Sequence, residues 1–334
     1  MKFALFALAS SVFSQTALQV VLSSDVHKTL ASLATPKVVQ VLNSTGPLTL
    51  FAPTDAAFAK LSPDTLAAVK ADSNLLESIL TYHVIPGVAY DPAQVKDADT
   101  FAATAQGETI EAVKANGGVT LQYGINTSSS VTASVKASNG IVHVVDTVLI
   151  PPTTTSKTAV AAKLNDLVSA LQKVGLVSAV DTTPGITVFA PLDSAFDKLN
   201  AFAKANGLTI TDDLLKTVLL THVVNKVIYS KDIVAAGQAT VKALSGAPVT
   251  ATYKNNAVTV SGEGSIAPAN VVVADVLIAN GVVHVIDQVI LPSLKSSTPA
   301  ATTQAPAAAS SVLSSASTLQ KFLFIAAGAF MVLA

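Results

Sequence analysis

The stretch that decides the fold is Thr49-Leu-Phe-Ala-Pro-Thr-Asp-Ala-Ala-Phe58, because it occurs twice. It recurs as Thr187-Val-Phe-Ala-Pro-Leu-Asp-Ser-Ala-Phe196, with seven of ten positions identical. A second block, Asn139-Gly-Ile-Val-His-Val-Val-Asp-Thr-Val-Leu-Ile-Pro151, recurs as Asn280-Gly-Val-Val-His-Val-Ile-Asp-Gln-Val-Ile-Leu-Pro292, with eight of thirteen identical. The copies lie 138 and 141 residues apart in the two cases. The chain therefore carries one domain twice.

Each copy mixes helices and strands. The apolar run Leu48–Ala52 predicts a buried strand that ends at Pro53. Asp55, and Asp193 in the second copy, follow that strand where a helix cap is expected. Short β-branched runs separated by glycine and asparagine fill residues 109–145 and predict antiparallel strands. Helices early and strands late predict an α+β domain.

Composition changes mark the domain boundaries. A Pro/Thr connector separates the copies, and a Ser/Thr/Ala/Pro-rich stretch with almost no bulky apolar residue follows the second copy. Such a stretch cannot pack a core and is typical of O-glycosylated stalks. The expected segments are a signal peptide (1–17), domain 1 (18–152), a linker (153–157), domain 2 (158–293), a stalk (294–311) and a lipid-attachment propeptide (312–334).

Both ends of the chain indicate export and surface attachment. Lys2 precedes the apolar run Phe3–Phe13, which small residues follow, as in a secretory signal peptide. The apolar tail Phe322–Ala334 has thirteen residues, whereas a membrane-spanning helix needs about 20. Small residues and a polar spacer precede the tail, which is the layout of a glycosylphosphatidylinositol (GPI) signal. The candidate attachment residues are Ala309, Ser310 and Ser311.

Composition excludes several classes of function. The net charge is −1, and all 20 basic residues are lysines scattered along the chain. Nucleic-acid binders favour clustered positive charge and arginine forks, so we expect no nucleic-acid partner. Cysteine is absent, which removes thiol catalysis, cysteine-bound zinc and disulfides.

The two repeated blocks, with a histidine about 30 residues after the first of them, resemble the signature of fasciclin domains. The resemblance covers about 18–152 and 158–293. It implies that each copy is a small β-sandwich wedge of mainly antiparallel strands with a cluster of helices. It also implies an extracellular role in cell adhesion or in organising a matrix or cell wall.

The resemblance also points to one segment, Tyr82-His83, which in this family is often credited with adhesive contacts. The second copy has Thr221-His222 at that position. Adhesion through the second copy is therefore the less secure expectation.

The motif histidines and aspartates have two readings. The candidates are His83, His143, His222 and His284, with Asp55, Asp146, Asp193 and Asp287. They could form a two-histidine, one-carboxylate metal site in each copy. However, residues three apart on a strand point to opposite faces, which argues against His143 and Asp146 as a ligand pair. We expect neutral core histidines that pin strands to helices, with no metal and no cofactor.

No enzymatic constellation is evident, so we expect no catalytic residue. No serine lies in a Gly-x-Ser-x-Gly elbow, and the sparse acidic residues offer no clear glycosidase pair. Two sequons, at Asn43 and Asn126, predict N-glycosylation in a secreted chain.

Two functions remain open for these tandem domains. The first is adhesion or scaffolding at the cell surface or wall, with matrix or wall components, glycans or neighbouring copies as partners and the GPI lipid as the membrane link. The alternative is a surface module that binds a specific polysaccharide or lipid-like ligand.

Overall fold

The computed structural model describes residues 15–92, 100–115, 117–207 and 209–293. Most of the expected signal peptide lies outside these residues. So do the expected stalk and propeptide, with the candidate attachment residues Ala309, Ser310 and Ser311. Among the described residues, no helix combines the length and apolar character needed to cross a bilayer.

The first repeat begins with helices and ends with strands, interrupted by one early strand that carries the first motif block. Its helices are α2 (Ala17–Leu22), α3 (Lys28–Leu33), α4 (Pro36–Leu42), α5 (Asp55–Ala59), α6 (Pro63–Ala71) and α7 (Ser73–Tyr82). Its strands are β1 (Leu48–Pro53), β2 (Val84–Pro86), β3 (Thr100–Ala103), β4 (Thr109–Ala115), β5 (Gly118–Gln122), β6 (Ser128–Ala137) and β7 (Gly140–Val145).

The second repeat has a similar order of elements, with two helices instead of three after its first strand and a further helix after its second strand. Its helices are α8 (Thr155–Ala161), α9 (Asn165–Lys173), α10 (Val177–Thr182), α11 (Asp193–Ala205), α12 (Asp212–Thr221) and α13 (Ser230–Ala236). Its strands are β8 (Ile186–Pro191), β9 (Val223–Val224), β10 (Gln238–Lys242), β11 (Pro248–Lys254), β12 (Ala257–Gly262), β13 (Ala269–Ile278) and β14 (Gly281–Ile286).

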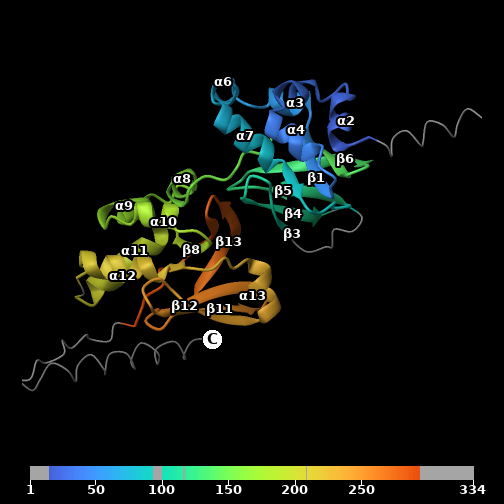
Figure 1. The fold of residues 1–334 in the computed structure, drawn as a ribbon. Coiled ribbons are helices and arrows are strands. Elements are labelled where there is room, and N and C mark those ends of the chain that lie inside the picture. The colour runs from blue at the N-terminus through green and yellow to red at the C-terminus, as the bar shows by residue number, and fades with distance from the viewer. Residues whose placement is uncertain (1–14, 93–99, 116, 208, 294–334) are drawn as a thin grey trace, which may run out of the picture. The chain divides into compact units, whose positions relative to one another are not determined.

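One parallel strand pair forms the centre of each repeat and is made of the two motif blocks. In the first repeat the sheet order is β2-β1-β7-β6-β5-β4-β3, and β1 runs parallel to β7. In the second repeat the order is β10-β11-β12-β13-β14-β8-β9, with β14 parallel to β8. The other strand pairs are antiparallel. This confirms the α+β class and explains why the two blocks recur together (Figure 1).

A long strand turns each sheet into a wedge. Residues 128–130 of β6 pair with β5, whereas residues 131–137 pair with β7. The strand thus belongs to both halves of the wedge, and apolar residues fill the space between the halves. Phe51, Ile110, Leu121 and Val145 are at most 4 % exposed there.

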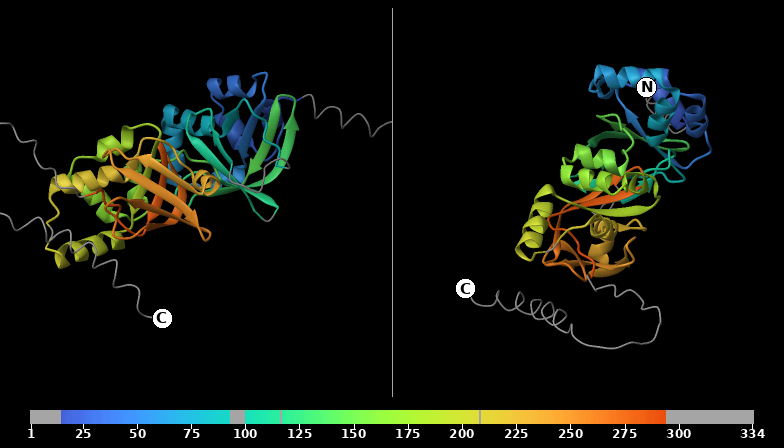
Figure 2. Two further views of the ribbon diagram at one scale, coloured as in Figure 1. Left: turned by 90° about the horizontal axis from the view of Figure 1, so that it is seen from below. Right: turned by 90° about the vertical axis from the view of Figure 1, so that its left-hand side faces the viewer.

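The helices cover the outer side of the central pair with a second apolar layer. In the second repeat Leu167, Leu171, Phe196 and Leu219 pack against β8 and β14. Figure 2 shows α9–α12 gathered on one side of the strands. Helix α13 is separate and packs on β11 through Ile233, which is 1 % exposed.

Asn139 and Gly140 do more than turn the chain. The amide Nδ2 of Asn139 donates to the carbonyls of Leu42 and Ser44 at 2.8 Å, and its Oδ1 accepts the Ala17 N–H at 2.8 Å. Glycine is needed at position 140 because a Cβ there would lie 2.0 Å from the Leu48 carbonyl oxygen.

Gly140→Ala should therefore lower the free energy of unfolding by about 1–3 kcal/mol, the usual cost of overpacking. Gly281→Ala should behave in the same way, because its Cβ would meet the Ile186 carbonyl oxygen at 1.9 Å. Gly87→Ala is the control, since its Cβ would meet nothing within 4 Å and tests only its left-handed φ of 79°. Urea unfolding measures all three variants. A Gly140→Ala protein as stable as wild type would contradict the assigned close approach.

Both repeats begin earlier than the sequence indicated. Thr16 caps α2, and Ala17 is fully buried, so the fold of the first repeat includes two residues assigned to the signal peptide. Helix α8 begins at Thr155, inside the expected linker 153–157. Thr155 is 2 % exposed and donates to the Val180 carbonyl at 2.9 Å. The linker is polar in sequence, but the Thr155 hydroxyl is hydrogen-bonded inside the fold.

Candidate functional site: the motif histidines and aspartates

His83 joins the end of a helix to the end of the repeat. It is the C-cap of α7 and is 1 % exposed. Its Nδ1–H donates to the Ile79 carbonyl at 2.7 Å, and its Nε2 accepts the Leu149 N–H at 2.9 Å. Both ring nitrogens are therefore satisfied by backbone groups, and the ring is neutral with the proton on Nδ1.

His222 repeats this arrangement at the end of α12. Its Nδ1–H donates to the Val218 carbonyl at 2.7 Å, and its Nε2 accepts the Ile290 N–H at 2.9 Å. Burial lowers the pKa of His83 and that of His222 to about 4. The carbonyl of each histidine also accepts the N–H of the adjacent strand residue, Phe51 or Phe189.

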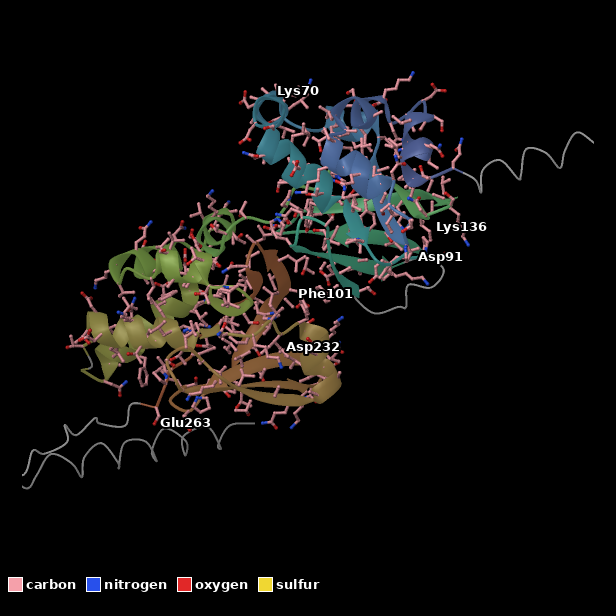
Figure 3. The ribbon with its side chains drawn as sticks, viewed as in Figure 1. Lys70, Asp91, Phe101, Lys136, Asp232 and Glu263 are labelled. Carbon is pink, nitrogen blue, oxygen red and sulfur yellow. The ribbon has the colours of Figure 1, made fainter. Side chains whose placement is uncertain are left out.

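His143 uses the opposite tautomer. Its Nε2–H donates to the Tyr90 carbonyl at 2.9 Å, and its Nδ1 accepts the Ser134 hydroxyl at 2.8 Å. Burial lowers the pKa of His143, although the Tyr90 carbonyl and the nearby Asp91 carboxylate act in the opposite direction. Asp91 also pairs with Lys136 at 3.2 Å, as the labelled side chains in Figure 3 show.

His284 keeps that tautomer but has a different partner on Nδ1. Its Nε2–H donates to the Ile228 carbonyl at 2.8 Å, and Nδ1 accepts the backbone N–H of Asp275 at 3.3 Å. Asp275 has a left-handed φ of 56° within an irregular stretch of β13. Its carboxylate accepts the N–H and the hydroxyl of Ser230, the first residue of α13. Sequence reasoning missed this link, because Asp275 lies outside the repeated blocks.

Asp55 and Asp193 cap helices, but not the helices that follow them in sequence. Thr54 caps α5, while the Asp55 carboxylate accepts the Thr29 N–H at 2.7 Å at the start of α3. Asp193 accepts the Asp166 N–H at 3.0 Å at the start of α9. The expectation that each caps its own helix was wrong, because the side chain of a residue inside the first turn points outward to a neighbouring helix. Hydrogen bonds from the Thr29 side chain and N–H lower the pKa of Asp55.

Asp193→Ala should lower the free energy of unfolding by about 1 kcal/mol, because the first turn of α9 loses its carboxylate acceptor. Ser194→Ala, one residue later in α11, is the matched control and should change stability little. Thermal or urea unfolding separates the two variants. Equal losses of stability in both variants would show that the hydrogen bond from Asp193 to α9 does not stabilise the protein.

Asp146 and Asp287 directly follow the last strand of each domain, β7 or β14, and link it to the long neighbouring strand, β6 or β13. Asp146 accepts the Ser130 N–H at 2.9 Å and pairs with Lys60 at 3.2 Å. Burial alone would raise the pKa of Asp146, but these partners together hold it below its usual value. Asp287 accepts the N–H of Asn270 at 2.7 Å.

Tyr82 and His83 do not offer an adhesive surface. Tyr82 is fully buried, and its hydroxyl donates to the Thr109 carbonyl at 2.8 Å. In the second repeat Thr221 is also fully buried, and its hydroxyl bonds to the Ser245 hydroxyl at 2.9 Å. These side chains cannot touch a partner in this fold, which corrects the expectation of direct contact. Any adhesive effect of the segment would have to come from the surface that it supports.

Glu108, in the first repeat, has a partly buried carboxyl group that the sequence did not reveal. Its Oε2 atom is buried and has no hydrogen-bond partner among the described residues. Burial raises the pKa of Glu108 to about 7, against the opposing hydrogen bond from Gln106. Ionisation of the Glu108 carboxyl group therefore lowers the free energy of unfolding.

Glu108→Gln should stabilise the protein at pH 8 and leave its stability nearly unchanged at pH 5. At pH 8 the substitution removes an ionised carboxylate, whereas at pH 5 it replaces a protonated, neutral carboxyl group with a neutral amide. The gain at pH 8 should be about 1–2 kcal/mol, after allowing for partial exposure. Urea titrations at the two pH values give the comparison. A difference that is the same at both values would contradict a raised pKa.

The two sequons lie on the exterior. Asn43 is exposed at the C-cap of α4, and Asn126 is exposed in the turn between β5 and β6 with a left-handed φ of 53°. Glycan attachment at both asparagines is our proposal, and this accessibility supports it.

The arrangement leaves the motif residues few chemical options. Each of the four histidines engages both ring nitrogens inside the protein, so no lone pair is free for a metal. Within the ranges that the structure covers, no three histidine or acidic side chains are grouped to hold a metal ion.

A family model described as "Fasciclin domain" matches residues 24–151 and again residues 162–292. The chain belongs to the fasciclin family. The two repeats are thus fasciclin domains.

Similar proteins come from distant organisms. A fasciclin-like arabinogalactan protein of Arthroderma benhamiae is 27 % identical over 276 residues, which are 78 % of this chain and 62 % of that protein. The cell surface glycolipoprotein MPB83 of Mycobacterium bovis is 40 % identical over 115 residues, which are 34 % of this chain and 48 % of that protein. The chain thus spans less than two thirds of the length of both relatives. The solved FAS1 domain pair of the insect cell adhesion molecule fasciclin I is 20 % identical, with 77 % of this chain and 93 % of that chain covered and a TM-score of 0.39.

Proposed function

We propose that this fasciclin protein acts outside the cell as an adhesion or wall-scaffolding molecule and that a GPI lipid holds it at the surface. The observation that carries the proposal is the internal use of the motif side chains. Histidines and aspartates that could have formed a site instead bond to backbone groups in both domains. Only the outer surfaces then remain for recognition.

The relatives support a place at the cell surface. One is named a cell surface glycolipoprotein and another a fasciclin-like arabinogalactan protein. The surface signals that we propose for this chain are an N-terminal signal peptide, two sequons, a stalk and lipid attachment at Ala309, Ser310 or Ser311. Two domains on one anchor raise the local concentration of binding surfaces, so individually weak contacts become effective.

Cell aggregation tests this proposal. Cells that display the full chain should aggregate, and treatment with phosphatidylinositol-specific phospholipase C should disperse them as the protein enters the medium. Mock-treated cells and cells without the protein are the controls. Aggregation that persists after the protein has been released would contradict anchored adhesion. Mass spectrometry of the mature C-terminal peptide tests the lipid independently.

A further inference from the structure

The second domain carries an outward strand face with two rows of hydroxyl and amide groups. Strands β10, β11 and β12 place residues directly opposite one another in two cross-strand rows. One row is Thr240, Thr250 and Ser261, and the other is Gln238, Thr252 and Thr259. We call these six residues the hydroxyl face.

The hydroxyl face points away from the core. Residues that alternate with it along the strands, namely Val249, Ala251 and Val260, are at most 4 % exposed and pack in the wedge interior. Successive side chains of a strand point to opposite sides. Gln238 and Thr240 are exposed, and the other four are partly exposed between their neighbours.

The fold does not require this chemistry. In the first domain the matching strands are β3, β4 and β5, and their rows are Phe101, Glu111 and Gln122, and Val113 with Thr120. That face therefore includes a carboxylate and a valine. In the second domain Lys242 and Lys254 lie on the same side of the strands as the hydroxyl face, one row beyond it at either end.

Spacing makes the hydroxyl face a regular array. Neighbouring strands lie about 4.8 Å apart, and side chains on one face of a strand repeat about every 7 Å. The Thr240 and Thr250 hydroxyls are 2.9 Å apart, which orients one toward the other. Each hydroxyl has one donor and two acceptor positions, so capacity remains for a ligand.

We propose that the hydroxyl face binds an extended, neutral polysaccharide. Sugar hydroxyls both donate and accept, as threonine does, and a polymer presents them in repeating order to a regular array. An acidic polymer would meet cations only at the two ends of the array, at Lys242 and Lys254, and none within its rows, while a lipid or a second copy would need apolar area to bury. Because no aromatic ring lies in the rows for stacking, affinity should come from many weak contacts along one chain. The inference rests on the proposed function only for its extracellular setting.

Sedimentation with insoluble polymers tests the proposal. The full chain should co-sediment with at least one of particulate β-1,3-glucan, chitin and cellulose, and short oligosaccharides of the same polymer should compete poorly. The triple variant Thr250→Val, Thr252→Val and Thr259→Val removes hydroxyls while keeping residues that favour strands. Its affinity should fall at least about tenfold, the loss of about 1.4 kcal/mol expected from several weak hydrogen bonds.

Two controls separate the hydroxyl face from general stickiness. Thr120→Val with Gln122→Val alters β5, the strand of the first domain that matches β12, and should leave binding unchanged. Thr250→Glu places a carboxylate in the middle of the array and should also abolish binding, which guards against apolar adhesion of the valine variant. Circular dichroism checks that each variant is folded.

The proposal is overturned if wild type binds none of the three polymers, or if the triple variant and Thr250→Glu bind as wild type does. Binding only to an anionic polymer, lost in salt, would also overturn it. None of these results depends on cell aggregation or on the lipid anchor, so failure here is distinct from failure of the adhesion proposal.

Discussion

Replacing His83 or His222 with leucine is expected to destabilise the domain that contains it by about 2–5 kcal/mol. Leucine nearly preserves volume, but it leaves one buried carbonyl and one buried N–H without a partner. Each unsatisfied buried group costs about 1–3 kcal/mol. Both histidines are 1 % exposed, so water cannot replace the lost bonds. Urea unfolding gives the total loss, and hydrogen exchange shows which domain has become less protected.

His27→Leu provides a matched control within the same chain. His27 is also buried, at 4 % exposure, but its Nδ1 bonds only to the nearby Ser24 hydroxyl, and its Nε2 has no hydrogen-bond partner among the described residues. Leucine there gives up at most one contact with a backbone group, that of Ala52, rather than two bridging bonds, so the loss should be smaller than at His83. If His27→Leu costs as much as His83→Leu, general packing rather than the bridging hydrogen bonds explains the effect.

Stability is also expected to fall steeply as the pH drops from 6.5 toward 4. In that interval the unfolded chain protonates His83 and His222 near their ordinary pKa, whereas the folded protein keeps both neutral because their pKa is about 4. The unfolded state then binds more protons, so the free energy of unfolding rises with pH and is fully regained above 6.5. Each histidine accounts for about 3 kcal/mol.

Other groups modify this profile in known directions. Burial also lowers the pKa of His143 and of His284, so both add to the loss. Glu108 acts in the opposite direction between 4.5 and 7, because its raised pKa keeps a proton on the folded state. Asp55 and Asp146, whose pKa values are lowered, contribute only near pH 3.8 and below.

Urea titrations at pH 4.5, 5.5 and 7 measure the profile. The Glu108→Gln variant should show a steeper dependence than wild type, since the opposing group is gone. A wild-type protein equally stable at pH 4.5 and 7 would mean that the histidines titrate alike in both states.

The repeated blocks predicted the architecture because a central strand must be apolar on both faces. Leu48–Ala52 and the strand that contains His143 are such segments, and they form the parallel pair. Ser62 and Thr211 each cap the helix that directly follows, an arrangement that local sequence can indicate. The pairing of β1 with β7 across about 90 residues left no local signal, so it had to be seen in the structure.

Partners distant in sequence were the least predictable part of the candidate site. The histidines could be placed inside the fold from sequence, but Leu149, Ile290 and Ser134 as their partners could not. Asp193 was assigned to the wrong helix because local spacing carries no information about α9. Tyr82 was expected to be part of an adhesive segment on family resemblance alone, whereas the structure places it in the core.

The most direct test of the central claim is a pH titration of the imidazole rings by long-range ¹H–¹⁵N nuclear magnetic resonance, with and without added zinc. The account predicts Nδ1–H tautomers for His83 and His222, Nε2–H tautomers for His143 and His284, no protonation of His83 or His222 above pH 5, and no response to zinc. Rings that titrate near pH 6.5, or that shift when zinc is added, would contradict it.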